Sequence, residues 1–149
     1  MTNPQVLPRS AKDAAPASGH RSRSALEPPE IALSLQPRTP ARCRAFAQRA
    51  LAASGSRISR DVVDSVMIVA AELVTASYLG EASRVRVAID VRQRDLTVTV
   101  RDDRPGDRQL PPSTHDTREM LLDALTVERW VFTEGAETIH VARMLVSTG

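Results

Sequence analysis

A single carboxylate, Glu72, lies among apolar and small residues in the stretch AELVTASYLG, which runs from Ala71 to Gly80. A charged side chain is rarely buried without a partner, so a lone acid there belongs more often to a site or a solvent edge than to a core. Residues four positions apart share a helix face, which places Ala76 beside Glu72. Two interpretations of Glu72 stay open: a carboxylate facing a ligand pocket, and one at the solvent edge of a helix.

Three other groups carry reactive atoms, and each also has a plain structural explanation. The segment DDRPG, from Asp102 to Gly106, follows a strand-like run and matches a Pro-Gly turn that needs no ligand. His115 and Asp116 are adjacent, but two residues fall short of the three or four ligands that a metal site requires. The single cysteine, Cys43, excludes an intrachain disulfide and suits a small buried hydrophobe.

Length and composition favour one compact domain. The chain has 149 residues, of which 42% are hydrophobic. Its longest uncharged apolar run, Val66 to Ala71, is far shorter than the ~20 residues that span a membrane. Residues 1–30 lack the apolar segment of a secretory leader. From these two features together with the single cysteine, we expect no membrane association and a cytoplasmic location.

The charges are unevenly distributed along the chain. The net charge is only +2, yet Arg38 to Arg60 contains six arginines and no acid, whereas Asp61 to Gly149 contains ten arginines and fifteen acids. Such a positive region can meet nucleic acid, a phosphate or an acidic protein surface, or it can be a plain solvated helix face. Two Phe, one Tyr and one Trp provide few stacking platforms for single-stranded nucleic acid.

Hydrophobic periodicity predicts the elements of the N-terminal half. Residues 1–30 contain five of the ten prolines and almost no large apolar residue, which is typical of a disordered tail. IALSLQ, from Ile31 to Gln36, alternates as a half-buried strand does. A helix is predicted from Arg38 to Ser54. A second helix, from Ser56 or Ser59 to Gly80, is apolar over most of its circumference, so we expect it in the core.

The C-terminal half predicts two hairpins separated by a loop and a short helix. Ser83 to Val91 and Leu96 to Asp102 form the first hairpin, residues 103–117 form a long loop, Met120 to Leu125 form a helix, and a final hairpin turns at Glu134 to Glu137. We expect Trp130 in the core and a structural role for His140. The order predicts an α/β (α+β) two-layer sandwich whose mixed, largely antiparallel sheet has helices on one face.

This order, together with the motifs ELVTA, VTVRDDRPG and ERWVF, resembles the GHKL (histidine-kinase-like) ATPases. Within them it is similar to the anti-sigma-factor serine kinases of actinobacterial type. The resemblance extends from about Ile31 to Val146. It implies a histidine-kinase-like ATPase domain over residues 31–149, preceded by the tail of residues 1–30.

The resemblance assigns roles to individual residues. Glu72 matches the catalytic acid of the family, and Ala76 stands where the family has its Mg²⁺-ligating Asn. An Ala methyl supplies no oxygen ligand, so no metal-binding residue is assigned. Asp102 matches the acid that accepts a hydrogen bond from the adenine amino group, and Gly106 matches the second glycine of the same motif. Arg104 replaces the first glycine, so it should either strain the loop or fill the nucleotide's space.

The family's glycine-rich turn before the third helix is missing. This chain has THDTREML, from Thr114 to Leu121, at that place. Arg118, at the start of that helix, is left to hold a phosphate oxygen. The nucleotide-binding residues implied by the resemblance are therefore Asp102, Gly106 and Arg118, with ATP and Mg²⁺ bound weakly or not at all.

Three functions follow, in order of preference. The first is an anti-sigma-factor-like regulator that acts by protein contact, with a sigma factor or an anti-anti-sigma (STAS-type) protein as partner and a homodimer as its possible state. The second is an active ATP- and Mg²⁺-dependent serine/threonine kinase that phosphorylates the anti-anti-sigma antagonist. The third is nucleic-acid binding through Arg38 to Arg60, which rests on charge alone.

Overall fold

The computed structural model describes residues 27–104 and 112–147, and side chains of its third helix from residue 117 onward. The tail predicted over residues 1–30 therefore falls, up to residue 26, outside the described residues, as does the loop segment 105–111 with Gly106. The first described strand begins at Glu30, one residue earlier than predicted.

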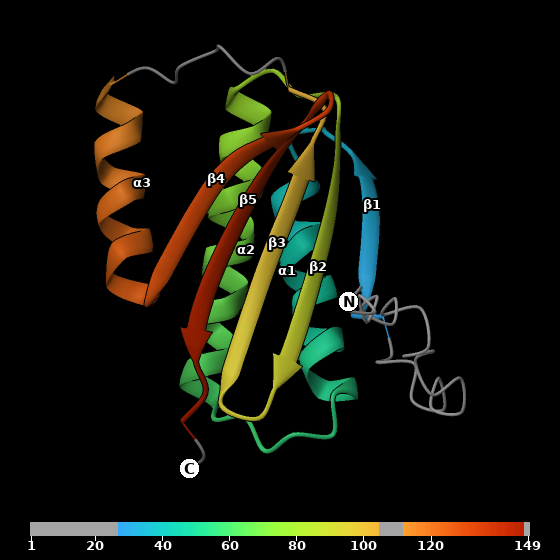
Figure 1. The fold of residues 1–149 in the computed structure, drawn as a ribbon, viewed down its shortest axis with the longest axis vertical. Coiled ribbons are helices and arrows are strands. Elements are labelled where there is room, and N and C mark those ends of the chain that lie inside the picture. The colour runs from blue at the N-terminus through green and yellow to red at the C-terminus, as the bar shows by residue number, and fades with distance from the viewer. Residues whose placement is uncertain (1–26, 105–111, 148–149) are drawn as a thin grey trace, which may run out of the picture.

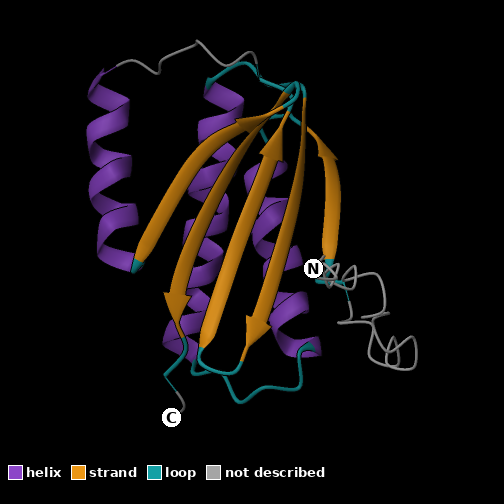
Figure 2. Cartoon of the chain, viewed as in Figure 1, coloured by secondary structure: helices purple, strands orange, loops and turns teal. Residues whose placement is uncertain are grey.

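The described chain folds as a five-stranded sheet with helices packed on one face (Figures 1 and 2). The elements follow in the order β1 (Glu30–Ser34), α1 (Thr39–Ala53), α2 (Arg60–Leu79), β2 (Arg84–Arg92), β3 (Asp95–Asp102), α3 (Pro112–Leu125), β4 (Glu128–Glu134) and β5 (Glu137–Leu145). The strand order in the sheet is β1-β2-β3-β5-β4. Every pairing in this described sheet is antiparallel, so the α+β sandwich is confirmed while the expectation of a mixed sheet is not.

The connection from β1 to α1 is tied by one hydroxyl. Thr39 Oγ1 donates to the Ser34 carbonyl at 3.0 Å and accepts from the Gln36 N–H at 2.8 Å. At the other end of α1, Gly55 follows the helix with a φ of 71°, a conformation that glycine adopts without steric cost. Hydrogen bonds between residues close in the sequence thus join β1, the turn and α1.

The long helix α2 begins and ends where the sequence indicates. The Ser59 hydroxyl, and not that of Ser56, caps its first turn by accepting from the Val62 N–H at 3.4 Å. Its last turn closes with the Gly80 N–H donating to the Ala76 carbonyl at 2.9 Å. Both ends are therefore specified by short-range signals.

The core lies between α1, α2 and the central strands. Alternate residues of β2 and β3 point to this face, as period-2 patterning requires. Its members include Val85, Val87, Ile89, Leu96, Val98 and Val100 from the sheet, Cys43, Phe46, Ala47 and Leu51 from α1, and Val66, Val69, Ala70, Leu73 and Val74 from α2. Cys43 is buried as predicted, and burial raises the pKa of its thiol to about 12. This cysteine is therefore a core hydrophobe at neutral pH.

By length and composition, α2 is apolar enough to cross a membrane, with a mean hydropathy of 1.7 over its most apolar window. The longest uncharged apolar run in the sequence did not indicate this candidate membrane span, because Asp64 and Glu72 divide the apolar residues of the helix. Half of that window is buried inside the fold. A core helix passes the same test, and the absence of membrane association stays a prediction.

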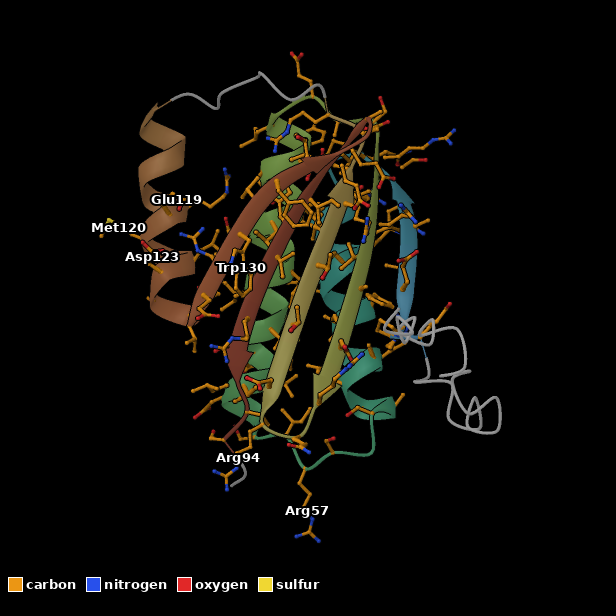
Figure 3. All side chains as sticks on the ribbon, in the orientation of Figure 1. Arg57, Arg94, Glu119, Met120, Asp123 and Trp130 are labelled. Carbon is orange, nitrogen blue, oxygen red and sulfur yellow. The ribbon has the colours of Figure 1, made fainter. Side chains whose placement is uncertain are left out.

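Two expectations for the C-terminal half are wrong. Over residues 112–117 the predicted loop is replaced by helix, so the third helix is longer than expected, since α3 already begins at Pro112. Proline is tolerated in a first helical turn, where its missing N–H has no intrahelical partner. Trp130 is not a core residue, because its side chain is 46% exposed. It lies on β4, the edge strand, where it points to the face that no helix covers (Figure 3).

Candidate functional site

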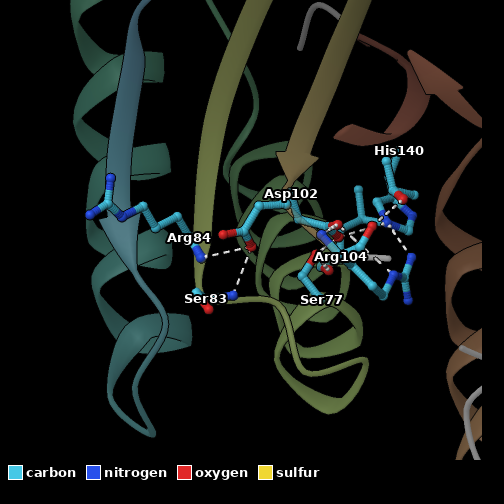
Figure 4. Close-up of polar contacts among 9 residues, drawn as sticks. Ser77, Ser83, Arg84, Asp102, Arg104 and His140 are labelled. Atoms are coloured by element: carbon cyan, nitrogen blue, oxygen red, sulfur yellow. Dashed lines mark hydrogen bonds and ion pairs between the residues drawn. The ribbon is translucent and has the colours of Figure 1, made fainter. Parts of the chain in front are cut away.

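The last residue of β3, Asp102, is a fully buried carboxylate surrounded by hydrogen-bond donors (Figure 4). Its Oδ2 accepts from the Ser77 hydroxyl of α2 at 2.5 Å and lies 3.3 Å from Nε2 of His140 on β5. Its Oδ1 accepts from the backbone N–H of Arg104 at 2.9 Å. Both oxygens are thus occupied by groups of the chain itself.

Strand alternation explains why this acid is buried. Leu96, Val98 and Val100 of β3 face the helices, and Asp102 continues the same series. Its position beside β5 brings it close to His140, which pairs with Val100 in the ladder. A carboxylate forced into this layer needs partners, since an unpaired buried charge is very costly.

The electrostatics of the cluster favour an ionised Asp102. Burial alone raises the pKa of this carboxyl, but hydrogen bonds from His140, Ser77 and the Arg104 backbone outweigh burial, and the net pKa is lowered. The Arg104 guanidinium adds a weaker Coulombic contribution in the same direction. At neutral pH the cluster therefore holds a negative charge that its neighbours already neutralise.

Arg104, for which a strained loop or a filled space was expected, is folded into this cluster. Its side chain is 10% exposed, and its Nη2 lies 2.9 Å from His140 Nε2. A Cβ at Gly80 would lie 2.4 Å from Arg104 Cδ, so the arginine packs directly on the glycine that ends α2. Within the described chain, the non-glycine residues with positive φ are Glu81 and Gln93. Two effects of Arg104 were expected, a strained backbone or a filled space, and the structure shows a filled space and no strain at Arg104.

The second predicted acid, Glu72, pairs with Arg118 between α2 and α3. The Arg118 Nε donates to Glu72 Oε2 at 3.1 Å, and the two side chains are 8% and 30% exposed. Arg118 Nη1 is buried and has no hydrogen-bond partner. The expectation that Arg118 stands at a helix start is wrong, since α3 begins six residues earlier, at Pro112. It acts here as the buried counter-ion of Glu72.

The candidate site residues form two separate groups, each of which includes one residue of α2. Glu72 and Ser77 are five residues apart, or ~7.5 Å along the helix, and each has its own partners. Ala76 is buried between them and offers no polar atom. A cleft of about 550 Å³ opens near Asp102 and Asp103, lined also by Ser34, Arg84 and Glu137. Glu72 is not among the described residues that line this cleft.

Two features of the described residues bear on the predicted binding of ATP and Mg²⁺, which itself stays a prediction. Asp102 has no exposed oxygen for an adenine amino group, and Arg104 occupies the adjacent space. No group of three or more His, Cys, Asp or Glu side chains able to hold a metal is found within residues 27–104 and 117–147. Gly106 lies outside the described segments, so its contribution stays a prediction.

Ser77 was not identified from the sequence. It directly follows Ala76 on α2, and its hydroxyl is the closest partner of Asp102. The sequence contains one signal for Ser77. Asp102 continues an inward-facing series of apolar residues on its strand, and a buried carboxylate needs a hydrogen-bond donor from the helix packed against that face. Ser77 is the polar residue whose burial in α2 is complete.

No family model and no curated protein matches this chain. The features of the described chain that bear on function are therefore the Asp102 cluster and the Glu72–Arg118 pair.

Proposed function

We propose that this protein is an anti-sigma-factor-like regulator with a histidine-kinase-like ATPase domain, which acts mainly by protein-protein binding and has weak or lost ATP binding. Its partner in this proposal is a sigma factor or an anti-anti-sigma protein of STAS type. The motifs ELVTA and VTVRDDRPG support the family assignment. The α+β sandwich is the fold class that the assignment requires.

One observation is the main support for the proposed loss of ATP binding. The carboxylate that would recognise adenine, Asp102, is 0% exposed, and its oxygens accept from Ser77 and the Arg104 backbone. A buried group whose hydrogen-bond capacity is used has little to offer a ligand, because binding would first break those bonds. The Arg104 side chain adds a steric obstacle beside Gly80.

The state of Glu72 supports the same conclusion. An acid that positions or activates a nucleophile needs access to the reacting group. Here its carboxylate pairs with Arg118 at 3.1 Å, and one turn further on Ala76 supplies no oxygen for Mg²⁺. Phosphoryl transfer relies on the metal and on positioning, so a chain with these substitutions is better suited to binding than to catalysis.

Nucleotide binding is tested by thermal unfolding of the purified full chain with ATP and Mg²⁺. A ligand at 100 times its dissociation constant would raise the unfolding free energy by about 2.7 kcal/mol. We expect no shift of the melting temperature at millimolar ATP. A clear stabilisation, together with phosphate transfer to a STAS-type protein, would support the kinase function instead.

A double variant, Ala76→Asn with Arg104→Gly, restores both family residues. We expect it to regain ATP-dependent stabilisation, while Ala76→Asn with Arg94→Gly serves as the control because Arg94 is exposed in the β2–β3 turn. Protein contact is tested separately, by titrating the purified chain with the sigma factors and STAS-type proteins of its own genome. Absence of binding to all of them would contradict the regulatory part of the proposal.

A further inference from the structure

The outward side of α1 is a strip of arginine and alanine. Arg42 and Arg49 are seven residues apart, almost two helical turns, so they lie on one line along the helix. Arg38, at the N-cap position, continues this line, and Ala45 and Ala52 lie beside it. All five are exposed, while the opposite side of α1 is buried in the core. We name these five residues the α1 arginine surface.

The three arginines of this surface have no partners within the described part of the chain. No ion pair or side-chain hydrogen bond joins Arg38, Arg42 or Arg49 to another described residue. By contrast, three arginines of the sheet, Arg86, Arg129 and Arg143, each contact two carboxylates. Within the described residues, the charges of the α1 arginine surface are therefore uncompensated, whereas those of these three arginines are paired.

Helix stability does not explain this placement. The N-terminal end of a helix carries partial positive charge, which favours acids and disfavours cations in the first turn. The first turn of α1 contains no acid, and two of the arginines, Arg38 and Arg42, lie at this end. The N-cap side chain also makes no capping hydrogen bond. An anionic partner is what this end of the helix lacks.

We propose that the α1 arginine surface binds an acidic helical segment of a protein partner. Three arginines in a straight line, spanning ~16 Å, match carboxylates presented at the same spacing by another helix. Arginine binds carboxylates with two parallel hydrogen bonds, and the small side chains of Ala45 and Ala52 let a second helix approach to the ~8–10 Å of packed helices. This inference rests on the proposed function, because it names the surface through which the protein contact is made.

A protein helix fits this surface better than nucleic acid does. Besides its arginines, the exposed side of α1 offers one further side chain able to contact bases, Gln48, and no aromatic residue on which a base could stack. Its exposed positions between the arginines are mainly alanine. Positive charge alone suits several kinds of partner. Together with the small side chains of Ala45 and Ala52, it favours a helix that packs against α1.

The test uses two helical peptides as probes with the full chain. The matched peptide carries glutamates at positions i, i+7 and i+11 on an alanine background, and the scrambled peptide has the same composition with glutamates distributed around the helix. By fluorescence anisotropy at low salt, we expect the matched peptide to bind at least fivefold more tightly. The Arg42→Glu/Arg49→Glu variant should lose at least tenfold in affinity. The control Arg84→Glu/Arg94→Glu, with the same charge change at exposed positions of the sheet, should lose less than twofold.

Three results would overturn the inference: equal affinities for the two peptides, equal losses in both variants, or no peptide binding at all. A duplex DNA of similar length that binds more tightly than the matched peptide, and loses binding in Arg42→Glu/Arg49→Glu, would assign the surface to nucleic acid. Circular dichroism of both variants checks that they are folded. Stabilisation by ATP would contradict only the proposed loss of nucleotide binding, because the α1 arginine surface shares no residue with the Asp102 cluster.

Discussion

Strands β2 and β3 meet α1 and α2 through buried aliphatic side chains, whereas β4, at the far edge of the sheet, meets α3 mainly through charged ones. Leu96, Val98 and Val100 are fully buried. By contrast, Arg129 of β4 donates to Glu119 at 2.5 Å and to Asp123, both on α3 (Figure 3). Ion pairs near the surface stabilise far less than apolar burial does. We therefore expect the β4–α3 side to open more easily than the central core.

The exposed apolar residues follow the same division. Trp130, Val131 and Phe132 of β4 are 46%, 63% and 47% exposed, and Met120 of α3 is 73% exposed. In the central strands, the apolar side chains on the helix-facing side, such as Val98 and Val100, are closed by α1 and α2. Trp130 and Phe132 lie on the opposite, uncovered side of the sheet. The comparison shows where the fold is held by packing and where it depends on weaker, charged contacts.

The largest effect is expected from Leu96→Ala, in the central core. Truncating a fully buried leucine removes its transfer free energy and leaves a cavity, at a cost of about 2–5 kcal/mol of unfolding free energy. Leu145→Ala, on the same sheet but 57% exposed, is the control and should cost less than about 1 kcal/mol. Urea unfolding measures both, and similar losses would contradict the comparison.

Removal of the Asp102 carboxylate should have the next largest effect. Asp102→Ala leaves the Ser77 hydroxyl and the Arg104 N–H without their acceptor, at about 1–3 kcal/mol. The pKa of Asp102 is lowered in the folded state, so its contribution is present above its unfolded pKa of about 3.9. It is lost as pH falls through the lower, folded pKa.

The unfolding free energy of the native chain should therefore fall more steeply than that of the variant as the pH drops below about 4. Urea unfolding across this range measures the difference. Parallel pH profiles for the two proteins would show that Asp102 makes no such contribution.

Trp130→Ala should cost only about 1 kcal/mol, less than the roughly 3–5 kcal/mol of a buried tryptophan. The reason is its 46% exposure on the uncovered face of the edge strand. Because the chain has one tryptophan, its fluorescence reports this environment directly. Strong quenching by iodide in the native state is expected, and a protected tryptophan would refute the assignment of β4 as an open edge.

The smallest effect, about 0.5 kcal/mol, is expected from Arg129→Ala, because its partners Glu119 and Asp123 are 37% and 70% exposed and are screened by solvent. Hydrogen exchange should become faster in residues 117–125 and stay unchanged in α2. Arg143→Ala, which removes a comparable pair of ionic contacts within the sheet, is the control and should leave α3 exchange unaffected. Faster exchange across the whole domain would argue against a separately weakened β4–α3 side.

The success of the sequence predictions varies with the range of the interactions involved. The ends of α2 depend on neighbours three or four residues away: its C-terminal end was predicted at Gly80, where it lies, and its N-cap, Ser59, is one of the two serines that the sequence left open. The start of α3 was not predicted, because its first turn lacks apolar periodicity and contains Pro112. Trp130 was misplaced because regular alternation does not say which side of a strand faces the helices, and only the register of β4 with β5 shows that Trp130 lies on the uncovered side.

The candidate site was found in part for the same reason. Glu72 and Asp102 stand out as acids in apolar patterns, so the sequence indicated them. Their partners, Arg118 and His140, are 46 and 38 residues away in the chain. No local pattern shows which cation meets which acid.

By itself, the sequence determined the helices and strands of the central core and the uneven distribution of arginine, because periodicity, caps and charge are properties of short segments. Only the tertiary structure decided that Asp102 is enclosed by Ser77 and His140, that Arg104 packs on Gly80, and that Arg38, Arg42 and Arg49 have no partner among the described residues. Those outcomes depend on which elements become neighbours, and burial and pairing of charges exist only once the layers have packed.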